Sequence, residues 1–352
     1  MTSINTDFPA TGPVTLKTPV RFADAIPDAA DVVIIGGGVV GVFAALYLNR
    51  AGYKVVLCEK GRIAGEQSSR NWGWIRQQGR DEDELPIATH SLALWREVSE
   101  QVKGRTGFVE GNGVSFVAST QERMEQLSSW LEIANRHNLD SQMLTKKQLS
   151  ELISRNPDMD ASAHQWVGAL NTPGDARAEP WQAVPVVAEL AQSEGVIIRE
   201  DCAVRTLDIA NGNISGVHTE SGLIKTTQVV LAAGSWTSLF ARNLGINIPQ
   251  LSVKAQVART AILPEVLSGN AVDEKLAVRR RQDGSYTLAL TDSHTLYIGP
   301  DAFRNVWIYR QMAVEGIKET RFNPAAPKGY PDAWTTKRKW SATDISPFER
   351  MR

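Results

Sequence analysis

The spacing of glycines at residues 36–41 (GGGVVG) constrains the fold of this chain more than any other feature. The glycines follow Asp31–Ile35 (DVVII), a β-branched run typical of a buried parallel strand, and they open a helix-spaced apolar run at Val39–Asn49. Lys54–Glu59 (KVVLCE) predicts a second buried strand. Strand, glycine turn, helix and strand in this order predict a βαβ unit of the dinucleotide-binding kind.

Each glycine of the G-x-G-x-x-G pattern has a physical role. Gly36 permits the tight turn, Gly38 lets the backbone approach a pyrophosphate, and Gly41 lets the helix pack against the strand. The helix N-terminus offers unpaired N–H groups to the anion. Glu59 lies near the ~20-residue spacing expected for a ribose-binding acid. It is predicted to accept hydrogen bonds from the ribose hydroxyls and to disfavour a 2′-phosphate.

Length and composition bound the class of protein. The 352 residues suffice for one large or two medium domains, and a net charge of −1 gives no global field that favours nucleic acid as a partner. Cys58 and Cys202, without a CxxC motif, predict buried free thiols, no metal site and a reducing compartment. The segment before Asp31 lacks the apolar stretch of a signal peptide, so we expect a cytoplasmic protein.

Four segments of the chain resemble one known family. They are DVVIIGGGVVG at 31–41, VVLCEKGRIAGEQSSRNWGW at 55–74, the strand and helix region 179–205, and QVVLAAGSWTSLF at 228–240. Together they resemble the D-amino-acid-oxidase-like (DAO) superfamily of FAD-dependent oxidoreductases. The run EKGRIAGEQSSR followed by NWGWIRQQGRD is most similar to bacterial L-amino-acid deaminases and L-arginine-type oxidases.

The resemblance implies an α/β fold. It would consist of a Rossmann-like FAD-binding domain of the glutathione-reductase type and a second, sheet-rich α+β substrate domain. FAD is favoured over NAD by the segment EKG at 59–61 and by the distant run VVLAAG at 229–234. The expected division is an N-terminal arm at 1–30, a discontinuous FAD-binding domain at 31–105 and 176–250, a substrate domain at 106–175 and 251–330, and the start of a C-terminal segment at 331–352.

By the same resemblance, the glycine turn and Glu59 would hold the AMP half of FAD, and the 67–73 run would face the pyrophosphate, the ribityl chain and the ring system. Val204 would bond the adenine through its backbone. Ser68 and Ser69 have helix capping as an alternative role. The expected cofactor-contacting residues are Gly36, Gly38, Val39, Val40, Gly41, Glu59, Lys60, Gln67, Ser68, Ser69, Arg70, Asn71, Trp72, Gly73, Val204, Ala233, Gly234 and Trp236.

The activity implied by the resemblance is oxidation of the C–N bond of an amino acid to an imine, which water hydrolyses to a 2-oxo acid and ammonia. The flavin would accept the hydride, so no Ser/His/Asp triad is required. A substrate carboxylate calls for a positioned guanidinium. Instead of binding substrate, the run Arg279–Arg281 could be part of a solvated edge strand. Tyr286 could likewise be an ordinary aromatic residue of a strand. The expected substrate-contacting residues are Trp74, Arg76, Gln77, Arg80, Arg280 and Tyr286.

Other functional hypotheses stay open. One is a D-amino-acid dehydrogenase or a sarcosine- or glycine-oxidase-like amine oxidoreductase, and another is a catalytically impaired remnant or subunit. Trp307, Trp334 and Trp340, with the basic run Lys337–Lys339, suggest weak membrane association, with a solvated loop as the alternative. Oxygen or a respiratory chain would accept the electrons, and a homo-oligomer stays open.

The final residues of the sequence predict the beginning of a helix. Ser346 is a predicted N-cap, Pro347 stands at the first helical position and Glu349 at the third. Members of the superfamily close the FAD-binding domain with a longer segment that carries a glycine-rich loop and a final helix. We therefore expect the chain to be truncated in its C-terminal segment, which would impair activity.

Overall fold

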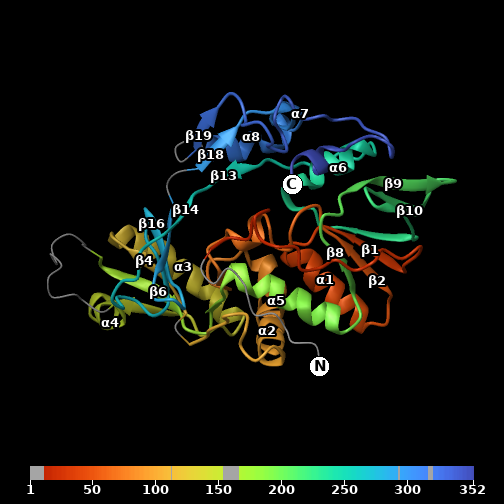
Figure 1. The fold of residues 1–352 in the computed structure, drawn as a ribbon. Helices are drawn as coiled ribbons and strands as arrows, with labels where there is room; N and C mark the ends of the chain where they lie inside the picture. The colour runs from red at the N-terminus through yellow and green to blue at the C-terminus, as the bar shows by residue number, and fades with distance from the viewer. Residues whose placement is uncertain (1–11, 112, 154–165, 292–293, 316–319) are drawn as a thin grey trace. The chain divides into compact units, whose positions relative to one another are not determined.

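The structure, a computed structural model, describes residues 12–111, 113–153, 166–291, 294–315 and 320–352 (Figure 1). The chain divides into two compact units. The first contains Met1–Arg70, Val184–Lys254 and His294–Arg352, and the second contains Asn71–Ala183 and Ala255–Ser293. This division differs from the expected one, because residues 71–105 and 176–183 belong to the second unit, and residues 251–254 and 294–352 belong to the first.

A four-stranded parallel sheet forms the centre of the first unit. Its order is β12 (Gln228–Leu231), β1 (Val32–Ile35), β2 (Val55–Cys58) and β8 (Ile197–Arg199). Every residue of β1 and β2 is buried, as their β-branched sequences require of central strands. Helix α1 (Val39–Arg50) connects β1 to β2 and packs against both strands. The predicted βαβ unit is therefore present.

Two smaller sheets and several helices complete the first unit. One sheet is an antiparallel meander, and the other joins strands from three separate parts of the chain. Their strands are β9 (Val204–Ala210), β10 (Asn213–Thr219) and β11 (Gly222–Lys225), and β13 (Val253–Lys254), β18 (His294–Tyr297) and β19 (Thr320–Asn323). The helices are α6 (Thr237–Asn243), α7 (Pro300–Arg304), α8 (Val306–Glu315) and α9 (Pro347–Arg350), with the later part of α5 (Pro180–Ser193).

One buried apolar cluster joins the parallel sheet of the first unit to segments far away in the sequence. Val33 and Val56 of the sheet belong to it with Val217 of β10. Phe240 of α6 and Phe348 of α9 belong to the same cluster. Burial of apolar surface therefore holds residues near 348 against a sheet formed near residue 33.

The second unit is built on a seven-stranded sheet, which confirms the predicted sheet-rich α+β architecture. The strand order is β14 (Val257–Arg259), β17 (Tyr286–Leu290), β16 (Leu276–Arg280), β15 (Asn270–Val272), β4 (Val114–Ala118), β6 (Gly168–Thr172) and β5 (Gln142–Thr145). A two-stranded sheet pairs β3 (Trp74–Ile75) with β7 (Ala176–Arg177). The helices are α2 (Leu85–Gln101), α3 (Gln121–Arg136) and α4 (Lys146–Leu152).

A β-hairpin that the glycines of residues 107–118 suggest is not formed. Among the residues of this segment that the structure describes, all but 112, the strand is Val114–Ala118, and it pairs with β6 and with β15, both far away in the sequence. Val109 instead makes an isolated bridge to Arg177. Long-range pairing thus takes the place of a local hairpin, because the buried strand finds its partners elsewhere in the sheet.

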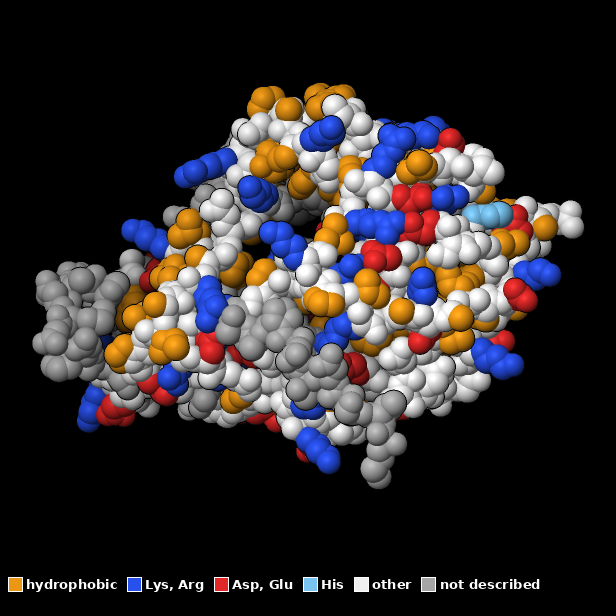
Figure 2. Space-filling model, viewed as in Figure 1, with side chains coloured by type: hydrophobic (Ala, Val, Ile, Leu, Met, Phe, Trp, Pro, Cys, Tyr) orange, Lys and Arg blue, Asp and Glu red, His pale blue; other side chains and the backbone are white. Residues whose placement is uncertain are grey.

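The surface has mixed charge and a few exposed tryptophans. Basic and acidic side chains are interspersed on the face that Figure 2 shows. Trp307 and Trp334 are exposed, at 76% and 56%, whereas Trp340 is buried in the apolar cluster of the first unit and is not an interfacial residue. In the described part of the chain, no helix combines the length and the apolar character needed to cross a membrane.

Replacing Leu57 by alanine is expected to lower the free energy of unfolding by about 2–5 kcal/mol, because a fully buried side chain in β2 is lost and a cavity remains. Urea unfolding followed by tryptophan fluorescence measures the change. Ile246→Ala is the matched control in the same unit, since Ile246 is 57% exposed and should shift the midpoint little. Equal shifts for both variants would contradict this assignment of the core.

Candidate functional site

A cleft in the first unit opens at the carboxyl ends of β1, β2 and β12. Ligands bind at this edge of open parallel sheets, because the loops and helix N-termini that follow the strands converge there. The residues that line the cleft come from the glycine turn, the 58–68 loop, the 232–236 turn and three distant side chains. They are Ile35, Gly36, Gly38, Cys58, Glu59, Lys60, Glu66, Gln67, Ser68, Val204, Ala232, Ala233, Gly234, Ser235, Trp236, Phe240 and Phe348.

The three glycines of the turn are required for different reasons. Gly36 has φ +110°, and a Cβ there would lie 2.5 Å from the carbonyl oxygen of Ala232. A Cβ on Gly41 would overlap the carbonyl oxygen of Gly36. At Gly38 the one atom of the described residues that a Cβ would approach within 4 Å is Ser68 Oγ, at 3.1 Å. Gly36 and Gly41 are therefore demanded by the packing of the chain on itself, whereas Gly38 leaves room on the side of the cleft.

Ser68 lies at the N-terminus of α1. Its Oγ accepts a hydrogen bond of 2.9 Å from the amide of Val39, while the N-cap residue of the helix, Gly38, has no side chain to cap it. The first amides of a helix attract negative charge, and a hydroxyl beside them adds a donor or acceptor. Neither Val39 nor Val40 is among the residues that line the cleft, and the Val40 side chain is 66% exposed.

Glu59 joins the glycine turn to the following loop. Its Oε2 accepts from the amide of Gly37 at 2.7 Å, and its Oε1 accepts from the amide of Gly61 at 2.8 Å. Burial raises the pKa of Glu59 above its usual value, although the two amides and Lys60 act to lower it. Each carboxylate oxygen has two acceptor positions, so Glu59 retains the capacity to bind ribose hydroxyls.

Lys60, Glu66 and Trp236 form one polar and aromatic cluster at the cleft. Lys60 Nζ lies 4.4 Å from the centroid of the Trp236 ring and donates to Glu66 Oε1 at 2.6 Å. Trp236 Nε1 donates to the same oxygen at 3.3 Å. The cluster fixes the 59–66 loop against the turn that follows β12.

The structure divides the remaining expected cofactor residues into three groups. Gln67, Ala233 and Gly234 line the cleft. Ser69 accepts from the amide of Val14, and Arg70 donates to backbone carbonyls, including that of Val14 at 3.1 Å, so both hold the 12–18 segment. Asn71, Trp72 and Gly73 belong to the second unit. Asn71 Oδ1 accepts from the amide of Gly73, and the rings of Trp72 and Trp74 meet edge to face at 5.2 Å.

Sequence reasoning missed several residues that line the cleft. Ile35, Cys58, Ala232 and Ser235 flank predicted positions, so widening each motif by one residue would have found them. Glu66 lies in the quoted 55–74 run and could have been named from it. Phe240 ends the quoted 228–240 run and could likewise have been named from it. Phe348 had no local signal, because its place in the cleft follows from tertiary packing alone.

In the second unit, a group of arginines surrounds one buried carboxylate. Glu179 is 1% exposed and accepts from Arg279 Nη2 at 3.2 Å, while Arg177 Nη1 lies 3.8 Å away. The guanidinium of Arg281 lies 3.7 Å from the centroid of the Trp181 ring. Burial lowers the pKa of Arg281 to about 10. The group has more cationic than anionic side chains, which is favourable for an added anion.

Several buried donors of this arginine group have no acceptor among the described residues. They are Arg177 Nε and Nη1, Arg279 Nε, Trp74 Nε1 and Trp181 Nε1. Trp74 lies directly opposite Arg177 in the pairing of β3 with β7, and Arg279 lies 5.6 Å from the Trp181 ring. Buried donors without acceptors are costly, and a carboxylate, which only accepts hydrogen bonds, would complement them.

The other expected substrate residues of the second unit have protein partners. Arg76 donates to the carbonyl of Gln78, and Arg80 forms an exposed ion pair with Glu84 at 3.5 Å. Arg280 pairs with Glu265 on the surface. Tyr286 donates to the carbonyl of Pro264 and accepts from the amide of Val266, contacts that a substrate would have to displace.

Asp175 is a fully buried carboxylate that organises the residues after β3. It accepts from the amides of Gln77 and Gln78 at 2.7 and 3.2 Å. The side chain of Gln78 is also buried, donating to the carbonyl of Leu170 and accepting from Thr172 Oγ1. Burial raises the pKa of Asp175 to about 6, although the amides and Arg76 act to lower it.

The sequence model of the DAO family, described as FAD dependent oxidoreductase, matches residues 31–344. The chain therefore belongs to this family, and the resemblance noted from its sequence is confirmed. Rat mitochondrial dimethylglycine dehydrogenase is 28% identical over 262 residues, which are 74% of this chain and 30% of that protein. The chain thus spans less than a third of the length of this curated relative.

Two solved structures of L-amino acid deaminases are similar in fold. The enzyme from Proteus myxofaciens, in complex with anthranilate, has a TM-score of 0.86 and 27% identity, covering 94% of this chain and 74% of that one. The enzyme from Proteus vulgaris has a TM-score of 0.85 and 26% identity, covering 94% and 76%. The predicted fold class is confirmed by these similarities.

The stability that Asp175 contributes should fall as the pH rises. The folded protein retains the proton up to a pH of about 6, whereas an unfolded aspartic acid releases it near pH ~4. The folded state therefore binds more protons between these values, and the loss, on the order of 3 kcal/mol, is complete above the folded pKa. Urea unfolding of the wild type and Asp175→Asn at several pH values measures it. A difference between the two proteins that is independent of pH would contradict the burial of this charge.

Proposed function

We propose that the first unit binds FAD and that the protein is a flavin-dependent oxidoreductase of amino acids. The observation that carries the proposal is the arrangement of Gly38, Ser68 and Glu59 around one cleft at the carboxyl edge of a parallel sheet. It offers helix amides to a pyrophosphate and a carboxylate to a ribose. The residues present therefore fit a dinucleotide.

The adenosine and pyrophosphate parts of the cofactor have candidate partners in the first unit. The amide of Val40 and the Ser68 hydroxyl would hold the pyrophosphate, and the amide of Val39, which donates to Ser68 Oγ, would orient that hydroxyl. Glu59 would bind the adenosine ribose, and Val204, at the beginning of β9, would lie beside the adenine. Bound FAD would supply the two-electron acceptor for oxidation of a C–N bond. The protein would bind and orient the reactants and exclude water.

The arginine group of the second unit supports an amino acid as substrate. We propose that Arg177 and Arg281, rather than Arg280, hold the substrate carboxylate. Two buried donors of Arg177, Nε and Nη1, have no acceptor among the described residues, and Arg281 is stacked on Trp181. One such donor, Nε, belongs to Arg280, whose Nη1 pairs with Glu265. A planar guanidinium held by an aromatic ring is suited to two parallel hydrogen bonds with a carboxylate.

An N-methylated amino acid is the second candidate substrate. The similarity to dimethylglycine dehydrogenase favours it, and both candidates carry the carboxylate that the arginine group would bind. Anaerobic mixing of the FAD-loaded protein with L-amino acids, D-amino acids and N-methylglycines, followed near roughly 450 nm where flavins absorb, separates the classes. Admission of oxygen or of a quinone then identifies the electron acceptor. Failure of every amino acid to reduce a bound flavin would overturn the proposed activity.

Gly38→Ala tests the cofactor site. The added methyl group would meet only Ser68 Oγ, so the turn should keep its fold, but the methyl group would keep a pyrophosphate away from the helix amides. The dissociation constant for FAD should rise by roughly 5- to 30-fold, since such charge–helix contacts contribute about 1–2 kcal/mol. Quenching of flavin fluorescence measures it. Gly12→Ala is the control, because a Cβ there has no atom within 4 Å.

Arg177→Gln tests the substrate site. Loss of a charge-assisted hydrogen bond, at about 1.5–3 kcal/mol, should raise KM for the best amino acid by roughly 10- to 100-fold while FAD binding stays unchanged. Steady-state kinetics measure KM, and flavin fluorescence measures the cofactor content. Arg280→Gln is the control, because Arg280 pairs with Glu265 on the surface. A larger effect of Arg280→Gln than of Arg177→Gln would contradict the proposal and would indicate that Arg280, the residue expected from the sequence, binds the substrate carboxylate.

A further inference from the structure

We infer that Phe348 forms a wall of the adenosine side of the nucleotide cleft, and that ion pairs of the 340–352 segment hold it there. The inference rests on the proposed binding of FAD and deepens it. Phe348 lines the same cleft as Glu59 and Val204, although it lies about 290 and 140 positions away from them in the sequence. Phe348 is therefore a candidate residue for adenosine specificity, and it belongs to no sequence motif that would have predicted this role.

The ring of Phe348 is held by other aromatic rings. It is 5% exposed and contacts Trp340 edge to face, with centroids 5.4 Å apart. Trp236 lies at 5.9 Å, also edge to face, and Phe240 at 5.8 Å. Trp236 and Phe240 themselves line the cleft. Aromatic packing of this kind stabilises a ring beyond simple area burial, so the position of the ring is well determined.

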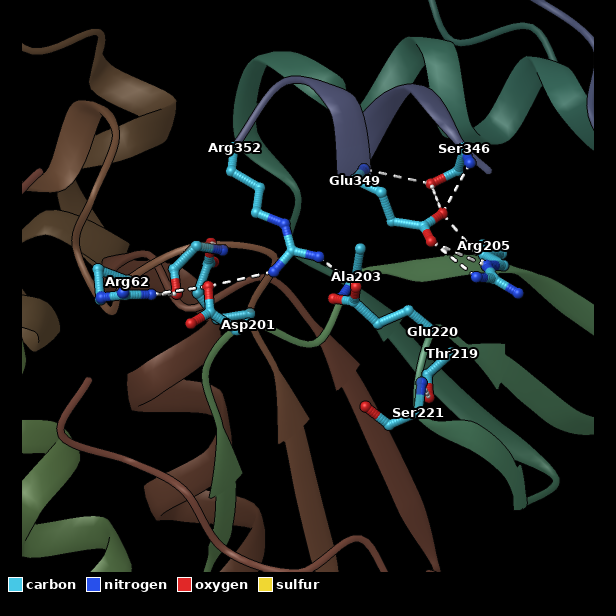
Figure 3. A network of polar contacts seen from close by, with 12 residues as sticks. Arg62, Asp201, Ala203, Arg205, Thr219, Glu220, Ser221, Ser346, Glu349 and Arg352 are labelled. Carbon is cyan, nitrogen blue, oxygen red and sulfur yellow. Dashed lines mark hydrogen bonds and ion pairs between the residues drawn. The ribbon is translucent and has the colours of Figure 1, made fainter. Parts of the chain in front are cut away.

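Two sets of polar contacts fasten the segment on both sides of Phe348 (Figure 3). Glu349 accepts from Arg205 Nη2 at 2.7 Å and completes a capping box with Ser346. Arg352 bonds Asp201 at 3.1 Å and also pairs with Glu220. Hydrogen bonds from Arg205 and Ser346 lower the pKa of Glu349, although burial acts to raise it. Glu349 therefore stays charged at neutral pH.

The segment is also tied to the two loops that border the cleft. Lys60 Nζ donates to the carbonyl of Met351 at 2.6 Å while it contacts Glu66 and the ring of Trp236. Trp340 Nε1 donates to the carbonyl of Arg205, the residue after Val204, at 2.6 Å. The contacts thus converge on the loop that follows β2 and on the beginning of β9, which border the adenosine part of the proposed site.

The proposed position of Phe348 predicts how the affinities for ADP and for FAD change when the ring is removed. If Phe348 is a wall of the adenosine side, ADP and FAD lose affinity by the same factor when the ring is removed, because both contain the adenosine. If Glu349 acts through Phe348, its removal weakens binding only while the ring is present. Glu349 is accordingly a positioning residue.

The experiment measures dissociation constants of the full chain for ADP and for FAD by isothermal titration. Phe348→Ala and Phe348→Leu are expected to raise both constants by the same factor, about tenfold for alanine and less for leucine. Glu349→Gln is expected to raise them about threefold, with no further effect in the Phe348→Ala background. Ile345→Ala, at a side chain 54% exposed, is the control on the same segment. Urea midpoints check that each variant is folded.

The outcomes separate this inference from the proposed function. Wild-type protein that binds neither ADP nor FAD would overturn both. If the wild type binds both ligands and folded Phe348→Leu and Glu349→Gln have unchanged dissociation constants, the inference about Phe348 is wrong, while the proposed FAD binding stands. A loss of affinity for FAD without a matching loss for ADP would also contradict the inference, since the ring would then act elsewhere on the cofactor. Equal factors for the two ligands, and a Glu349→Gln effect that vanishes without the ring, would support it.

Discussion

A buried carboxylate, that of Glu59, holds together the parts of the first unit on which nucleotide binding depends. A buried charge is costly unless it is hydrogen-bonded, and the amides of Gly37 and Gly61 satisfy it. The backbone of the same residue extends the connection, because the amide of Cys202 donates to the Glu59 carbonyl at 2.8 Å. One residue thus fixes the glycine turn, the loop after β2 and the approach to β9.

In the second unit, too, buried charge must be compensated, but here the excess charge is positive. Glu179 is a single carboxylate within reach of Arg177 and Arg279, so positive charge is left partly uncompensated in a buried region. Structural ion pairs are normally balanced, and an imbalance of this kind is typical of a site that receives an anion. The geometry therefore supports an amino-acid carboxylate through the same physical argument that supports a pyrophosphate in the first unit.

The alternation of side chains along a strand explains what could be predicted for the run Arg279–Arg281. Side chains alternate along a strand, so Arg279 and Arg280 of β16 lie on opposite faces, and Arg281, one residue past the end of β16, is buried like Arg279. The sequence alone could state this alternation but not which face is buried, because that depends on Trp181 and Glu179 packing from elsewhere. The expected hairpin at 107–118 was wrong for a related reason, since β4 found long-range partners.

The sequence by itself determined the local features: the βαβ unit with its glycine turn, the acid at the end of β2, and the capping box that begins at Ser346. These follow from interactions between residues close in the chain, where residue type and spacing decide geometry. Only the tertiary structure decided that Phe348 lines the cleft with Glu59 and that Arg177 has buried donors with no acceptor in the described part of the chain. Such contacts arise from burial of apolar surface and from charge compensation across the fold, and no local spacing records them.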